Sequence, residues 1–77
     1  MAFIVDNKQT NKGDKATYVD YEGMMHEAVI KDINVRHVYH YADLETVIDG
    51  KPALVDAPYN ASPVNHSWNH GVDLQSF

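Results

Sequence analysis

The dipeptide Asp49-Gly50 is the feature of this sequence that most restricts its fold. It lies between two apolar runs, residues 44–48 and 51–55. Asp-Gly in this setting favours a type I′ turn, because both central residues of that turn need a positive φ. We therefore expect a two-residue β-hairpin here. Pro52 has no amide hydrogen, so we expect the returning strand to lie at a sheet edge or at a position without a ladder hydrogen bond.

The segments before this hairpin also have the character of strands. Residues 16–21 are rich in β-branched and aromatic side chains and precede a Glu-Gly turn. Residues 24–33 alternate with period two, and the face without formal charge is predicted to point to the core: Met24, His26, Ala28 and Ile30. Residues 32–34 interrupt the pattern, and residues 35–41 are predicted to form a third strand. A helix over residues 21–33 is the rival interpretation, since Met, Glu, Ala and Lys favour helices.

The two ends of the chain differ from this central region. Residues 1–15 combine an apolar tip, Phe3, Ile4 and Val5, with a polar stretch that has no periodicity and is typical of a solvated arm or linker. The tip either adds a strand to its own domain or docks onto a neighbouring molecule. Residues 16–71 are expected to form the folded domain and residues 72–77 a tail.

Loop-forming residues predominate after Asp56, with large side chains at Tyr59, Val64 and Trp68. Scattered large side chains of this kind fold back over an open barrel end, and Trp68 is the best candidate for that plug. The sequence therefore predicts an all-β fold, a small SH3-like barrel of about five strands with an extended N-terminal arm and a C-terminal aromatic loop. A small open sheet is the competing layout.

Size and charge limit the possible functions. A chain of 77 residues with no cysteine can form one small domain without disulfides, and such a domain gains stability from a partner or from self-assembly. The net charge of -5 opposes binding to phosphate backbones, so nucleic acid is not an expected ligand. No apolar run is long enough to cross a bilayer and no basic-then-apolar leader opens the chain, so we expect no membrane contact.

The five histidines raise the question of a metal site. His66 and His70 are spaced for one helix face, but the proline, asparagine and glycine residues around them oppose a stable helix. His37 and His40 would point to opposite faces of a strand. Surface or barrel-lining histidines are the favoured interpretation. A metal-dependent module built from His66, His70 and one of the other two is kept as a minor alternative.

Catalytic chemistry is not indicated either. There is no cysteine nucleophile, and the serines lie in C-terminal loop or tail sequence without a Gly-x-Ser-x-Gly elbow: Ser62, Ser67 and Ser76. Acidic pairs such as Asp43 and Glu45 flank turns, where carboxylates are ordinarily solvated. We expect a non-enzymatic protein without a cofactor.

Three segments together resemble a group of small tailed-bacteriophage proteins. The matching residues are the strand Ala28-Val29-Ile30, the turn Asp49-Gly50, and a C-terminal segment with Pro63, Trp68 and His70. The resemblance covers about fifty residues and implies a phage-encoded SH3-like β-barrel for which an accessory role in the virion is plausible. It implies no catalytic or binding residues.

The leading hypothesis is a structural protein of a phage virion, most concretely a capsid decoration (cement) subunit bound to the major capsid protein. The expected partner-binding residues are Phe3, Ile4, Val5, Tyr59 and Trp68, and self-association is also possible. The alternative is an acidic binding module that inhibits a host protein and presents a face made of Asp43, Glu45, Asp49 and Asp56.

Overall fold

The computed structural model describes residues 3–71, which form two antiparallel sheets and no helix. The strands are β1 (Phe3–Val5), β2 (Lys8–Thr10), β3 (Lys15–Val19), β4 (Met25–Arg36), β5 (Tyr39–Ile48), β6 (Lys51–Pro58) and β7 (Ser67–Asn69). β1 and β2 form a two-stranded sheet, and the other five form a sheet in the order β6-β5-β4-β3-β7.

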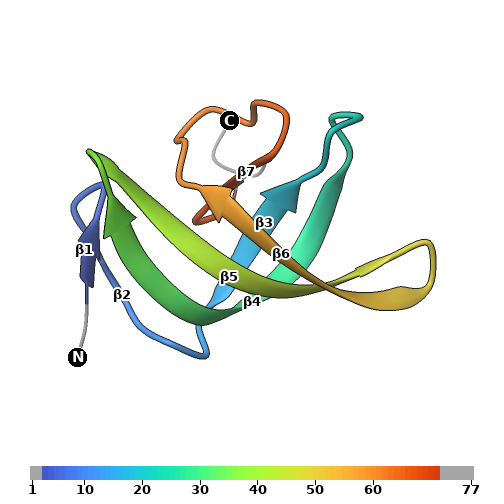
Figure 1. Ribbon diagram of the computed structural model, residues 1–77, viewed down its shortest axis with the longest axis horizontal. Coiled ribbons are helices and arrows are strands. Elements are labelled where there is room, and N and C mark those ends of the chain that lie inside the picture. Colours follow the sequence, from blue (N-terminus) through green and yellow to red (C-terminus); the bar gives the residue numbers. More distant parts are fainter. Residues whose placement is uncertain (1–2, 72–77) are drawn as a thin grey trace.

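The five-stranded sheet curls into a half-barrel (Figure 1). A parallel bridge between Tyr59 and Trp68 joins the chain just after β6 to β7, so the two edge strands meet at one end. The last strand returns to pair with β3, the first strand of this sheet. The predicted all-β barrel of about five strands is confirmed, and the rival helix over residues 21–33 is wrong because that region is mostly strand.

The hairpin predicted at Asp49-Gly50 is confirmed. Asp49 and Gly50 have φ of 54° and 76°, and Ile48 pairs with Lys51 across the two-residue turn. Positive φ at both central positions is what a type I′ turn requires. Pro52 lies in β6, which is an edge strand of the sheet, as its missing amide hydrogen led us to expect.

The predicted boundary between the second and third strands is wrong. β4 runs without a break from Met25 to Arg36, and the reversal comes later, at His37 and Val38. His37 has φ of 59°, although a residue with a Cβ rarely adopts this conformation. No glycine, proline, asparagine or aspartate marks this turn, so no local signal predicts it.

The alternation within β4 also changes part of the way along the strand. The register with β5 shifts between Ile30 and Asp32, where a bulge inserts one residue. Ala28, Ile30 and Ile33 are therefore all buried, although strict alternation places Ile33 on the opposite face. The prediction of the core face is right for Ala28 and Ile30, only partly right for half-buried His26, and wrong for Met24, which is 62% exposed.

Trp68 is the largest side chain of the core and has no exposed surface. It lies opposite Tyr18 in the register between β7 and β3, and its indole Nε1 donates a hydrogen bond to the carbonyl oxygen of His40 at 3.2 Å. The predicted plug is thus buried as expected. It belongs to a short strand, however, and not to a loop, because pairing with β3 satisfies the backbone of residues 67–69.

The N-terminal residues pack on the chain's own barrel. β1 and β2 form a tight hairpin in which Val5 pairs with Lys8, and Val5 and Thr10 are buried. The His70 ring bonds to the carbonyl oxygen of Val5 at 2.8 Å. The polar stretch is mostly exposed, as expected, but it supplies β2 and the start of β3 and is therefore not a linker without strands. The predicted tail, residues 72–77, lies outside the described residues.

Candidate functional site

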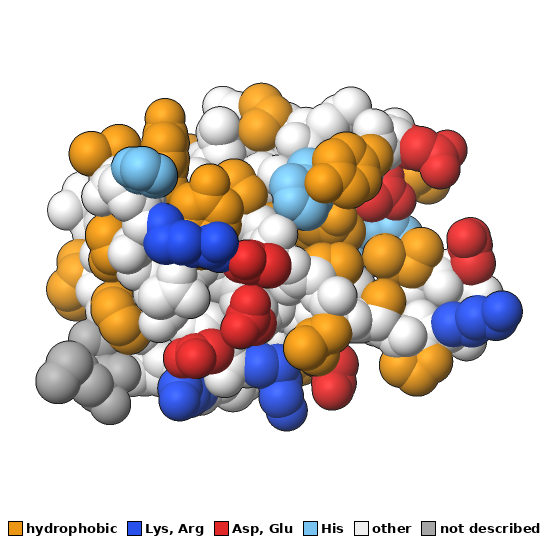
Figure 2. Space-filling view, viewed as in Figure 1, with side chains coloured by type: hydrophobic (Ala, Val, Ile, Leu, Met, Phe, Trp, Pro, Cys, Tyr) orange, Lys and Arg blue, Asp and Glu red, His pale blue; other side chains and the backbone are white. Residues whose placement is uncertain are grey.

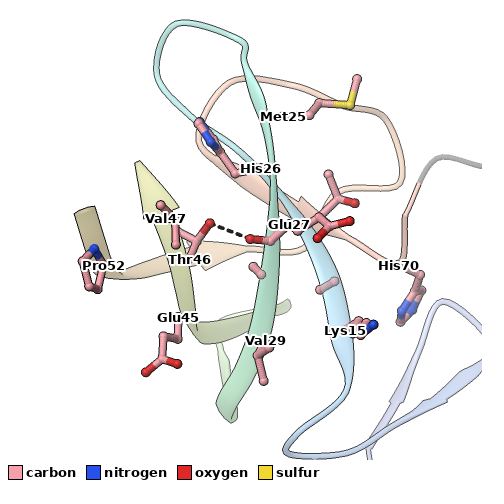
Figure 3. Close-up of a pocket in the computed structure, with 13 residues that line it drawn as sticks. Lys15, Met25, His26, Glu27, Val29, Glu45, Thr46, Val47, Pro52 and His70 are labelled. Atoms are coloured by element: carbon pink, nitrogen blue, oxygen red, sulfur yellow. Dashed lines mark hydrogen bonds between the residues drawn. The ribbon is translucent and has the colours of Figure 1, made fainter. Parts of the chain in front are cut away.

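The described residues form an open groove of about 890 Å³, named here the β4–β5 groove (Figure 3). Strands β3, β4, β5 and β6 contribute to it, together with His70 after β7. Its lining includes Lys15, Met25, His26, Glu27, Glu45, Thr46, Val47 and Pro52.

The groove exists because β5 leaves β4 before either strand ends. The register between the two strands stops at the pair Ala28 and Thr46. Beyond it, Met25 to Glu27 pair only with β3, whereas Val47 and Ile48 pair only with β6. The hydroxyl of Thr46 donates a hydrogen bond to the carbonyl oxygen of Glu27 at 2.7 Å, and this side-chain contact marks the point of divergence.

The direction of the β4 backbone follows from its bonds to β3. Ile30 donates its amide hydrogen to the carbonyl of Asp14 at 2.9 Å, and the carbonyl of Met24 accepts from Asp20 at 2.9 Å. Along an antiparallel strand, the backbone groups of successive residues bond to opposite sides. The even-numbered residues in this half of β4 therefore bond to β3. The amides of Met25 and Glu27 consequently point the other way, into the groove.

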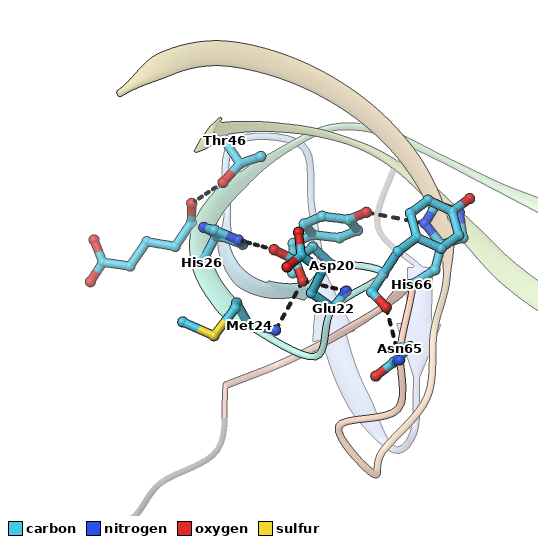
Figure 4. Close-up of polar contacts among 10 residues, drawn as sticks. Asp20, Glu22, Met24, His26, Thr46, Asn65 and His66 are labelled. Atoms are coloured by element: carbon cyan, nitrogen blue, oxygen red, sulfur yellow. Dashed lines mark hydrogen bonds and ion pairs between the residues drawn. The ribbon is translucent and has the colours of Figure 1, made fainter. Parts of the chain in front are cut away.

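A cluster around Asp20 builds one end of the groove (Figure 4). Asp20 Oδ2 lies 2.7 Å from Nε2 of His26, and Asp20 Oδ1 accepts hydrogen bonds from the amides of Glu22 and Met24 at 2.8 and 2.9 Å. The hydrogen bond from His26 and then that from the Met24 amide hold the pKa of the Asp20 carboxyl below its ordinary value. This carboxylate shapes the turn between β3 and β4 and orients the His26 ring.

Two tyrosines and His66 continue this cluster. Tyr18 Oη lies 3.1 Å from Nδ1 of His66, and the ring of Tyr21 stacks on that imidazole with centroids 4.3 Å apart. Burial, followed by the nearby Tyr21 and Asp20, raises the pKa of the Tyr18 phenol. His66 itself has φ of 54°. The contacts of this cluster hold the loop before β7 against the turn between β3 and β4.

An Asp-His pair such as Asp20 and His26 can hold an imidazole in the orientation of a general base. The Asp20 oxygens also bond to two backbone amides of its own turn. These contacts give the pair an architectural role, which is to fix the wall of the groove that His26 lines.

The histidines predicted as possible metal ligands engage different partners. His66 bonds to Tyr18, and His70 bonds to the carbonyl oxygen of Val5. His37 lies in the turn between β4 and β5, whereas His40 lies within β5. Within residues 3–71, no three histidine or carboxylate side chains are grouped so that they could hold a metal ion.

The residues predicted to bind a partner occupy very different environments. Val5 and Trp68 have no exposed surface, so their side chains cannot contact a partner in this structure. Phe3 is half-buried with its ring edge-on to His40, and Ile4 is 63% exposed. Tyr59 is half-buried against Trp68, with centroids 4.9 Å apart. Of these five residues, only Ile4 presents most of its side chain to solvent.

The phenol of Tyr59 provides a test of how the N-terminal hairpin is attached. Tyr59 Oη donates a hydrogen bond to Asp6 at 2.9 Å, and burial together with this carboxylate raises the pKa of Tyr59 to about 12. Because the folded-state pKa is raised, the contribution of this group to stability is present below its ordinary pKa of 10.0 and is lost as pH rises toward about 12.

We expect Asp6→Asn to lower the pKa of Tyr59, because the neutral amide no longer disfavours the phenolate. The difference between the phenolate absorbance titrations of the unmodified protein and of Tyr59→Phe isolates this one phenol. Repeating this comparison with and without Tyr59→Phe in the Asp6→Asn background gives the change in the pKa of Tyr59. An unchanged pKa would show that Asp6 does not hold the Tyr59 hydroxyl in solution.

The outer face of the sheet carries a row of acidic residues. Asp32 pairs in register with Asp43, and Asp43 pairs with Asp56. Arg36 forms an ion pair with Asp56, and Lys12 lies 3.6 Å from Asp32. Figure 2 shows acidic and basic side chains gathered together on this view of the molecule, with hydrophobic side chains to either side. The predicted acidic face is therefore partly neutralised by basic residues.

Comparison of the chain with protein-family models, with curated proteins and with solved structures finds no match. Over residues 3–71, no helix is present that could span a bilayer. The groove and the exposed surfaces of the chain are therefore the features from which its function can be inferred.

Proposed function

We propose that this chain is a non-enzymatic protein-binding β domain, most concretely a decoration subunit of a bacteriophage capsid that bridges neighbouring shell proteins. Its proposed binding surfaces are two exposed apolar patches. The tip patch comprises Val35, Val38 and Tyr39, at the turn between β4 and β5. The arm patch comprises Val47, Pro52 and Leu54, on the hairpin of β5 and β6.

The position of these patches at opposite ends of β5 is the observation that carries the proposal. Val38 is 83% exposed and Leu54 is 67% exposed, so both leave a large apolar surface in water. A ten-residue strand is about 30 Å long, and the whole domain measures 32 × 31 × 22 Å. One subunit can therefore touch two neighbours at once, as a bridging protein must.

Bridging suits a small domain. Each patch alone buries little area and supports only weak binding. On a lattice, however, the second contact of a bridging subunit is effectively intramolecular, so two weak contacts combine into strong attachment. The resemblance to small phage proteins makes the phage capsid the candidate lattice.

Particle binding tests this proposal. We expect Val38→Asp and Leu54→Asp each to reduce binding to purified phage particles by about tenfold or more, because a carboxylate cannot be buried in an apolar contact without a partner. Val64→Asp is the matched control, since Val64 is 45% exposed but belongs to neither patch. Equal binding by all three variants would exclude the two patches as the contacts.

The alternative function, inhibition of a host protein through the acidic face, is supported by the alignment of Asp43 and Asp56 across β5 and β6. Proteomic analysis of purified particles separates the two. Stoichiometric copies support the decoration role, whereas absence from the particle supports the host inhibitor.

A further inference from the structure

A sheet can bind another protein through any strand edge that has free backbone groups, and in the five-stranded sheet the candidates are the β6 edge, the β7 edge and the start of β4. β6 is the first. Its residues 51, 53, 55 and 57 bond to β5. Two contacts establish this: Lys51 pairs with Ile48 across the two-residue turn, and the amide of Tyr59 donates a hydrogen bond to the carbonyl oxygen of His40 at 2.8 Å. Bonding directions alternate along the strand, so the odd-numbered residues between them also bond to β5. The outward-facing positions are therefore Pro52, Leu54, Asp56 and Pro58.

The two prolines close most of the β6 edge. Neither Pro52 nor Pro58 has an amide hydrogen, so two of the four outward positions cannot donate to an added strand. The exposed charge of Asp56 lies between them. Prolines and charges of this kind are how natural sheets prevent pairing between edges.

The β7 edge is already occupied. β7 has three residues, and its middle residue forms the parallel bridge with Tyr59. The carbonyl oxygen of Trp68 accepts the amide hydrogen of Asn60 at 2.9 Å. An added strand would have to displace this closure of the barrel.

The third edge, at the start of β4, carries the exposed charge of Glu27 but has neither a proline nor a bridge to another segment. The amides of Met25 and Glu27 point into the β4–β5 groove, where neither residue has a register partner on β5. Met25 is 51% exposed, and no proline interrupts β4. Of these three edges, the one at the start of β4 is therefore left open, and it faces the β4–β5 groove.

The charges around this edge indicate what kind of strand fits. Glu27 and Glu45 are exposed on the groove, and Lys15 is the one lysine or arginine among its described lining residues. Apolar side chains accompany them, chiefly Met25 and Val47, and the chain as a whole carries a net charge of -5. Glu27 and Glu45 lie on the exposed face of the sheet, whereas Ala28 and Thr46 point to the buried face. An extended segment with basic and apolar residues in alternation complements both faces, because its basic side chains lie beside the two glutamates and its apolar side chains point to the buried face.

We propose that an extended segment of a partner protein, with alternating basic and apolar side chains, adds as a strand to the β4 edge at Met25–Glu27. The main chain of the segment bonds to the amides of Met25 and Glu27, and a basic side chain pairs with Glu27 across the new strand. This inference rests on the proposed function, for which it supplies the chemistry of the bound partner segment.

Amide hydrogen exchange measured by NMR tests the proposal on the full chain. The probe is an acetylated and amidated seven-residue peptide of alternating lysine and valine. In the free protein, we expect the amides of Met25 and Glu27 to exchange fast, while those of His26 and Ala28, which bond to β3, exchange slowly. Saturating probe should slow exchange at Met25 and Glu27 by about tenfold or more and leave His26 and Ala28 unchanged.

Charge variants provide the controls. We expect Glu27→Lys to weaken binding of the probe by about tenfold, and Glu22→Lys, the same charge change in the turn outside the groove, to weaken it much less. A probe of alternating glutamate and valine should not protect the edge. Equal weakening by the two variants would mean that only net charge is sensed and would overturn the proposal.

Other occupants give different results. Protection of Met25 and Glu27 in the peptide-free protein would show that the chain itself or a second copy fills the edge, and protection confined to β6 or β7 would place the added strand elsewhere. Either result overturns the inference. Failure of the proposed function is distinguishable, because the probe would then protect the β4 edge while the protein fails to bind particles.

Discussion

Replacing Trp68 by alanine is expected to lower the free energy of unfolding by about 3–5 kcal/mol, the usual cost of truncating a buried aromatic side chain. Trp68 is fully buried, packs against Tyr59 and His70, and bonds through its indole nitrogen to His40. A domain of 77 residues has a total stability of only about 4–12 kcal/mol. The substitution should therefore remove at least about a quarter of the stability, and all of it if the total lies at the low end of this range.

Urea unfolding followed by circular dichroism measures this change. Trp68→Phe is the matched control, because it keeps an aromatic ring but removes the bond to the His40 carbonyl, and we expect it to cost clearly less than alanine. A loss below about 1 kcal/mol for Trp68→Ala would contradict the burial of the indole and the closure of the barrel at the Tyr59 bridge.

Truncation of Ile33 to alanine is the second large effect, with an expected cost of about 2–5 kcal/mol. Ile33 is 5% exposed because the bulge after Ile30 turns it into the core. Val29 is the comparison, since it is half-buried on the other face of β4 and its truncation should cost about 1 kcal/mol or less.

The pair tests the bulge directly. If β4 alternated strictly over its whole length, Ile33 would share a face with Val29, and the two truncations would have similar effects. Equal costs in urea unfolding, or a larger cost at Val29, would show that the register shift between Ile30 and Asp32 is absent in solution.

Part of the fold could be predicted because it depends on neighbours in sequence. Asp49 and Gly50 set the β5–β6 hairpin through their own φ preferences, and Pro52 restricts its strand through its missing amide hydrogen. The turn at His37 and Val38 could not be predicted in this way. There, the pairing of β4 with β5 on either side imposes a positive φ on a histidine.

The candidate site was missed by sequence reasoning for the same reason. Asp20 before a Glu-Gly turn was a local sign of a turn-capping carboxylate. Its bond to His26, however, depends on how the β3–β4 hairpin closes, and the bond between Tyr18 and His66 joins residues 48 positions apart. The groove depends on the point at which β5 leaves β4, which no periodicity encodes.

The sequence alone determined that this chain forms strands, where its tightest hairpin turns, and that Trp68 is buried, since these follow from backbone preferences and from the low affinity of a large apolar ring for water. The tertiary structure decided which strands pair, where the bulge reverses the faces of β4, and which edge stays open. Those properties come from contacts between residues distant in sequence. Barrel closure occupies backbone groups of β7, and two prolines block the β6 edge, whereas the amides of Met25 and Glu27 face the groove.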